Sequence, residues 1–107
     1  MNLIRHEIFT YRTRDGKAYF KFSYHRVQYG FEIDIHSHPS YRTRSTDMET
    51  IHRLASSREA PYKICVYASH RPKTLQEAKN LSIAYAEYTW EYIKTGVTID
   101  EQIANQN

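Results

Sequence analysis

Three segments in the first third of the chain alternate between hydrophobic and polar residues, which is the pattern of half-buried β-strands. They span residues 3–13, 18–26 and 31–37. Asp15-Gly16, between the first two, is a strong signal for a tight hairpin turn. The alternation therefore predicts an antiparallel three-stranded meander with one apolar face and one polar face.

The turn lengths predict how these strands pair. A two-residue first turn places Phe9 opposite Phe22, and a four-residue second turn places Lys21 opposite His36. A slip of one residue would move the hydrophobic side chains to the other face, so the apolar pattern favours this register.

The middle of the chain changes to a helical spacing of hydrophobic residues. Thr46 and Glu49 form a capping-box pattern, which predicts a short helix over residues 47–56. Residues 62–68 are almost continuously apolar and predict a fourth strand. A strand, a helix and another strand favour a right-handed crossover, and hence a parallel pairing of this strand at a position in the sheet that the sequence leaves open.

Residues 75–95 form the longest predicted element, a helix that begins after Thr74 and stops at Gly96. It is hydrophobic around most of its circumference, so we expect it to be clamped in the core or buried in a homodimer contact. Trp90 lies on one of its apolar stripes and is expected to be buried. Residues 98–107 are expected to form a C-terminal tail.

Together these elements predict a single α+β domain over residues 1–97. Its order is βββαβα, with one short and one long helix packed on one face of a sheet made from the meander and a fourth strand. The chain has 107 residues, which is the usual size of one hydrophobic core.

Composition adds charge and location to this picture. The formal net charge is +3, and residues 1–44 carry eight Lys and Arg against four Asp and Glu, whereas residues 45–107 carry seven against eight. Ten tyrosines supply most of the aromatic residues. Cys65 is the only cysteine, which excludes an intrachain disulfide and a cysteine zinc site and favours a reducing cytoplasm. No apolar run approaches the ~18 residues of a membrane span, so no membrane partner is expected.

The basic first half suggests that the polar face binds an acidic partner, either a protein or a nucleic acid. Tyrosines interleaved with arginine on a sheet can stack on bases and follow phosphates. The candidate binding residues lie on the strands and in the loop after the third strand: Arg12, Tyr19, Lys21, His25, Tyr41, Arg42 and Arg44. In this interpretation the protein is a small binding module without a cofactor.

An alternative function comes from residues 36–47, which read HSHPSYRTRSTD. Two histidines separated by one residue, a proline, and a later serine and aspartate resemble the H-x-H-P…S-x-x-D pattern of JAMM-type zinc peptidases. The resemblance implies a metal-dependent hydrolase in which His36, His38 and Asp47 hold zinc, with Glu7 or Glu32 as the general base. The interval between His38 and Asp47 is shorter than in that family, and one spacer residue is missing after the serine.

Two other interpretations of the histidines stay open. His36 and His38 can simply end a strand in solvent, since the proline after them stops the ladder. The predicted register also brings His6, His25 and Glu32 into one row across three strands, close enough for two imidazoles to share a metal ion.

Overall fold

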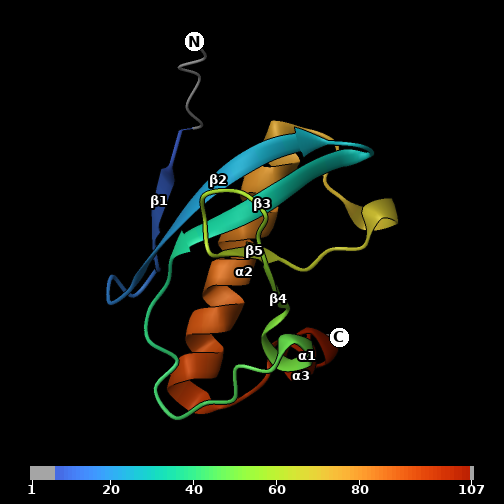
Figure 1. Ribbon diagram of the computed structural model, residues 1–107. Coiled ribbons are helices and arrows are strands. Elements are labelled where there is room, and N and C mark those ends of the chain that lie inside the picture. The colour runs from blue at the N-terminus through green and yellow to red at the C-terminus, as the bar shows by residue number, and fades with distance from the viewer. Residues whose placement is uncertain (1–6, 107) are drawn as a thin grey trace.

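A five-stranded antiparallel sheet carries the long helix α2 on one face (Figure 1). The computed structural model describes residues 7–106. The sheet has the order β1-β2-β3-β5-β4. The elements are β1 (Phe9–Arg12), β2 (Tyr19–Val27), β3 (Gly30–Ser37), α1 (Met48–Ile51), β4 (Arg53–Ala55), β5 (Tyr62–Ile64), a 3-10 turn (Ala68–His70), α2 (Leu75–Thr95) and α3 (Ile99–Ala104). The predicted α+β class is confirmed.

The predicted meander is confirmed, and so is most of its register. Phe9 pairs with Phe22 as predicted. A bulge between Lys21 and Phe22 shifts the end of the ladder, so Lys21 pairs with Ser37, and its predicted pairing with His36 is wrong. The first strand begins at Phe9, and the start of the predicted strand, including His6, lies outside the described residues.

The loop between β1 and β2 is closed by Thr13, whose backbone N–H donates to the carbonyl oxygen of Ala18 at 2.9 Å. The Asp15 carboxylate accepts from the Thr13 hydroxyl at 2.8 Å and from the Lys17 backbone N–H at 3.0 Å. Gly16 has a positive φ of 73°, which a residue without Cβ adopts at little cost. These contacts fix the direction in which the chain enters β2.

The predicted helix over residues 47–56 is largely wrong. Helix α1 has four residues, Asp47 occupies its N-cap position without a side-chain cap bond, and His52 ends it with a left-handed φ of 53°. The chain then continues as β4, which pairs antiparallel with β5. One turn of helix is too short to cross the sheet, so β5 enters as the return strand of this hairpin. It pairs antiparallel with β3, which corrects the predicted parallel pairing.

Helix α2 supplies one side of the hydrophobic core. It begins at Thr74, whose side chain accepts from the Glu77 backbone N–H, and it ends at Gly96 in a left-handed conformation. Phe20, Phe22 and Ile35 of the sheet are fully or almost fully buried against it. Trp90 is buried in this core, as predicted.

A third helix replaces the expected tail. Thr98 and Glu101 form a capping box at the start of α3, and Ile99 is buried. The Gln102 side-chain amide donates to the Tyr88 carbonyl oxygen on α2 at 3.0 Å. The cap and the buried isoleucine outweigh the polar residues at the chain end. In residues 7–106 no helix has the length and apolar character needed to cross a membrane.

Candidate functional site

Part of the polar face of the sheet is interior, because the chain between β4 and β5 crosses in front of β2 and β3 (Figure 1). Ser23 and Asp34 are each 1% exposed and His25 is 8% exposed. His25 therefore belongs to a buried polar layer, and its predicted position on an exposed binding face needs correction.

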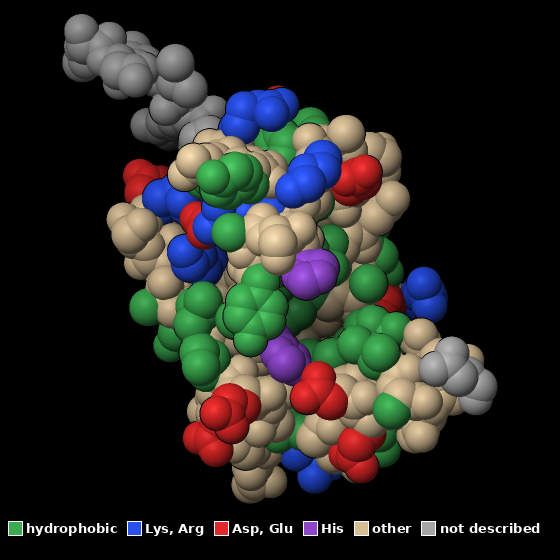
Figure 2. Space-filling view, turned by 90° about the vertical axis from the view of Figure 1, so that its right-hand side faces the viewer, with side chains coloured by type: hydrophobic (Ala, Val, Ile, Leu, Met, Phe, Trp, Pro, Cys, Tyr) green, Lys and Arg blue, Asp and Glu red, His purple; other side chains and the backbone are tan. Residues whose placement is uncertain are grey.

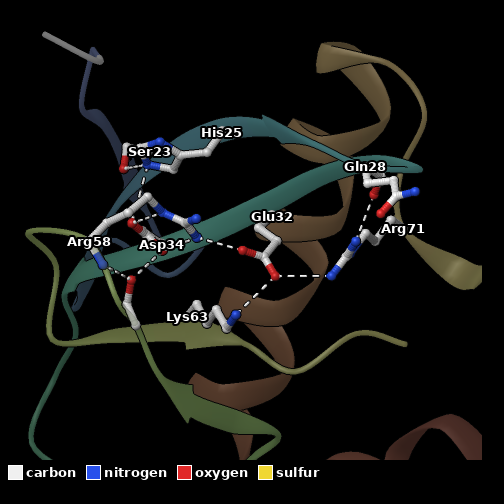
Figure 3. A network of polar contacts seen from close by, with 9 residues as sticks. Ser23, His25, Gln28, Glu32, Asp34, Arg58, Lys63 and Arg71 are labelled. Atoms are coloured by element: carbon white, nitrogen blue, oxygen red, sulfur yellow. Dashed lines mark hydrogen bonds and ion pairs between the residues drawn. The ribbon is translucent and has the colours of Figure 1, made fainter. Parts of the chain in front are cut away.

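Asp34 is the centre of this buried layer (Figure 3). Arg58 donates to both of its carboxylate oxygens, from Nε and from Nη2, each at 2.9 Å. The Ser56 hydroxyl donates to Oδ1 at 3.0 Å, and His25 Nε2 lies 3.2 Å from Oδ2. Such a two-point guanidinium–carboxylate pair is strong and directional, so it fixes the covering loop on the sheet.

Glu32 extends the same network along β3. It accepts from Arg58 at 2.9 Å, from Lys63 at 2.9 Å and from Arg71 at 3.2 Å. Burial raises the pKa of Glu32, but the hydrogen bonds and charges of Lys63 and Arg58 outweigh it and lower that pKa below its ordinary value. The hydrogen bond to Asp34 is the main cause that raises the pKa of Arg58. Arg58, Lys63 and Arg71 are therefore paired with carboxylates inside the fold, and their charges are not available to bind a partner.

Ser23 lies between two histidines of the same layer. Its hydroxyl oxygen is 2.7 Å from His25 Nε2 and 2.6 Å from His36 Nε2. A catalytic triad needs the aspartate and the serine on opposite ring nitrogens of one histidine, whereas Nε2 of His25 faces both Ser23 and Asp34. Ser23 is also buried, so this cluster supports the fold and has no geometry for nucleophilic attack.

The predicted zinc ligands have separate roles. His38 Nδ1 donates to the Pro39 carbonyl oxygen at 2.7 Å, and Nε2 accepts from Arg53 Nη1 at 3.0 Å, so both ring nitrogens are used. Asp47 occupies the N-cap position of α1, and His36 contacts Ser23. Among residues 7–106, no three His, Cys, Asp or Glu side chains form a group that could hold a metal ion. The structure does not bring His36, His38 and Asp47 together as one site.

Tyr41 also needs correction as a surface residue, because only 7% of it is exposed. The Arg53 guanidinium lies 5.4 Å from its ring and 3.6 Å from the Tyr62 ring. The His38 ring meets Tyr41 edge-on at 5.1 Å. Burial raises the pKa of Tyr41. The loop after β3 is therefore anchored by an aromatic cluster, and this anchor positions the residues that follow.

A surface pocket of about 340 Å³ opens between the β1–β2 loop and the anchored loop after β3. Two cations, two aromatic rings, a histidine and two serine hydroxyls are among its lining groups. The described lining residues are Lys17, Ala18, Tyr19, Ser37, His38, Pro39, Ser40, Arg42 and Trp90. No carboxylate is among them, although the chain carries 12 Asp and Glu in total. The pocket is thus a positively charged site beside an aromatic surface.

Arg42 is held in this pocket by an unusual backbone. Its φ is 58°, in the left-handed region that costs a bulky residue about 1–3 kcal/mol. The Ser40 hydroxyl accepts from its backbone N–H at 3.1 Å, and its guanidinium lies 5.6 Å from the Trp90 ring. The Trp90 indole N–H donates to Asp15 at 2.7 Å. That bond is the main cause that lowers the pKa of Asp15, so the carboxylate stays charged and keeps the indole fixed.

The cations around the pocket are free of carboxylates. Within the described chain, five basic residues at this end of the sheet have no ion-pair partner: Arg12, Lys17, Lys21, Arg42 and Arg44. Arg44 donates instead to the carbonyl oxygens of Ile93 and Lys94, near the end of α2. In contrast, Arg58, Lys63 and Arg71 are all paired. Arg26, Arg53, Lys73 and Lys79 have no ion pair among the described residues either, but they lie elsewhere on the molecule and do not line this pocket.

The opposite side of the molecule has a different character. Figure 2 shows the face that includes α1 and α3, with acidic side chains gathered in its lower part and Lys and Arg in its upper part. His52 and Asp100 pair at 2.8 Å and join these two helices. This face therefore carries charges of both signs, with the acidic side chains gathered around α1 and α3.

Comparisons with known proteins give no assignment. No protein-family model matches this chain, and no curated protein or solved structure matches it. The function is therefore inferred from the geometry and chemistry of the site.

The sequence predicted Tyr19 and Arg42 as binding residues and missed Lys17 and Trp90 in the same pocket. Lys17 follows the Asp-Gly turn directly, where the sequence pattern predicts a turn and nothing more. Trp90 is on a helix stripe that correctly predicts burial, but one edge of it also lines the pocket. A turn residue and a core residue carry no local signal that a distant loop completes a site with them.

Proposed function

We propose that this domain is a binding module that takes an acidic partner at the pocket between the β1–β2 loop and the loop after β3. The observation that carries the proposal is the pairing pattern: Lys17 and Arg42 line the pocket without an ion-pair partner among the described residues, and no described lining residue is acidic. Arg12, Lys21 and Arg44 add positive charge around this site.

The mixture of lining groups favours this site over an ordinary basic surface. Lys17 and Arg42 are exposed cations, and the Tyr19 and Trp90 rings that line the same pocket add an aromatic surface that a purely basic patch lacks. The Arg42 side chain is also held beside Trp90 before a ligand arrives, which lowers the entropy lost on binding. His25 and Tyr41 are left out of the proposed surface because they are buried.

The other functional expectations stay predictions. No contact among the described residues favours the zinc hydrolase built on His36, His38 and Asp47. The homodimer through α2 and the cytoplasmic location rest on the sequence, from the apolar girth of that helix and from the single cysteine Cys65.

Removing both pocket cations is expected to weaken binding to heparin, a general polyanion, by at least about tenfold. A hydrogen bond between a cation and an anionic group contributes about 1.5–3 kcal/mol to the binding free energy. A tenfold change in the dissociation constant corresponds to about 1.4 kcal/mol, so the loss of even one such bond reaches tenfold. Isothermal titration of wild type and of the double variant Lys17→Ala with Arg42→Ala measures this. The matched control is Lys73→Ala with Lys79→Ala, which removes the same charge away from the pocket. An equal loss in both double variants would contradict the proposal, because charge alone would then explain binding.

A further inference from the structure

We infer that the acidic partner is a single-stranded nucleic acid, and that the pocket takes one nucleotide with its phosphate at Lys17 and Arg42 and its base on Tyr19. The inference rests on the proposed function and names its ligand. The juxtaposition that carries it is two unpaired cations and a half-exposed aromatic ring in one pocket.

The chemistry of Arg42 indicates that the ligand carries a phosphate. Its guanidinium is a planar fork that matches the oxygens of a phosphate, and this match is better than for a lysine ammonium. The chain holds this arginine in a left-handed backbone conformation that glycine or asparagine would adopt with less strain. Strained residues that persist in a fold gather at ligand sites, and the observed outlier here lines a pocket.

The exposed ring of Tyr19 indicates that the ligand carries a base. It is 48% exposed at the start of β2, although most of the large hydrophobic side chains of this sheet are buried. Arg12 pairs directly opposite it on β1, and Lys21 Nζ lies 6.0 Å from its ring. Residues directly opposite on antiparallel strands share a face, so the ring lies among cations. An exposed ring flanked by positive charge is the arrangement that stacks bases and follows a phosphate backbone.

This combination favours a single strand over other acidic partners. The bases of a duplex are paired and stacked inside, so they cannot reach a ring in a pocket of about 340 Å³. An acidic protein would use the cations but would gain little from the ring, because a carboxylate has no π-face to stack on it. A strand with unpaired bases uses both features at once.

The test is fluorescence anisotropy with labelled ten-nucleotide thymidylate and uridylate strands, and with an abasic strand of the same length. The variant Tyr19→Leu keeps an apolar side chain and removes the ring. It is expected to raise the dissociation constant for a strand with bases by about 5- to 100-fold. The control is Tyr67→Leu, at a tyrosine that is 80% exposed outside the pocket, and it is expected to leave binding unchanged.

The abasic strand separates the ring from the charges. The wild-type protein is expected to bind the abasic strand about as weakly as the Tyr19→Leu variant binds the normal strand. On the abasic strand, Tyr19→Leu is expected to cause no further loss of affinity. Equal losses from Tyr19→Leu and Tyr67→Leu would overturn the inference. The inference would also be overturned if polyglutamate displaced the labelled strand as well as unlabelled thymidylate does. That result would favour an acidic protein as the partner.

Failure of the inference can be told from failure of the proposed function. If heparin binds through Lys17 and Arg42 but neither oligonucleotide binds, the nucleotide inference is overturned and the basic pocket stands. If heparin binding also does not depend on those two residues, the proposed function fails as well.

Discussion

Replacing Asp34 by alanine is expected to lower the free energy of unfolding by about 3–5 kcal/mol, because it breaks a buried ion pair from one side. The Asp34 side chain is 1% exposed and accepts two hydrogen bonds from Arg58. Its removal leaves the Arg58 guanidinium with only Glu32 as an acidic partner and releases Ser56. The loop that covers the sheet would then lose its main anchor.

Urea unfolding at neutral pH, followed by circular dichroism, measures this effect. Glu59→Ala is the matched control, since Glu59 is an exposed carboxylate in the same loop, and its change should stay within about 0.5 kcal/mol. Asp34→Ala combined with Arg58→Ala should cost less than the sum of the two single changes, because the double variant leaves neither charge buried alone. A loss below about 1 kcal/mol for Asp34→Ala would show that the network does not hold the loop.

Trp90→Ala is expected to cost about 3–5 kcal/mol of stability, the usual range for removing a large aromatic side chain from a core. Trp90 is 6% exposed, and its indole N–H donates to Asp15 in the β1–β2 loop at 2.7 Å. The change therefore opens a cavity beside α2 and also frees the loop that carries Lys17. Trp90→Phe should cost less, because it keeps an aromatic ring and loses mainly the hydrogen bond.

Thermal or urea unfolding of the two Trp90 variants checks this order. Tyr67→Ala is the control for removing an aromatic side chain, and at 80% exposure it should change stability by no more than about 0.5 kcal/mol. A cost below about 1 kcal/mol for Trp90→Ala would mean that this residue is not a core element of the fold.

The parts of the fold that the sequence predicted are those in which local rules decide the outcome. The alternation in β2 and β3 admits one register, since a slip would bury Lys21 and expose Phe20. Thr74 and Gly96 mark the ends of α2 by capping chemistry that involves only near neighbours. These features needed no knowledge of distant contacts.

The wrong predictions came from hydrophobic patterns that are compatible with either a helix or a strand. The spacing of Met48, Ile51 and Leu54 fits a helix, but the chain leaves the helix at His52 and pairs as β4. Local spacing could not show that β5 offers a strand partner there. A longer helix was needed for a parallel crossover, so the error in length also produced the error in strand direction.

The burial of the polar face could not be predicted from the strands alone. Alternation shows that His25, Glu32 and Asp34 share a face, but not whether another segment covers it. The cover comes from Arg58, more than twenty residues further along the chain, in a stretch without a motif. For the same reason the candidate site was only half predicted, since the aromatic anchor around Tyr41 positions its loop after β3 and the Trp90–Asp15 hydrogen bond holds its hairpin.

The most direct test of the proposed pocket is to map amide chemical shifts by NMR while a heparin oligosaccharide is added. The largest changes are expected on residues 17–19 and 37–42, while α3 and the 3-10 turn Ala68–His70 should stay nearly unchanged. Changes centred on another part of the surface, or no changes at all, would contradict the assignment of this pocket as the binding site.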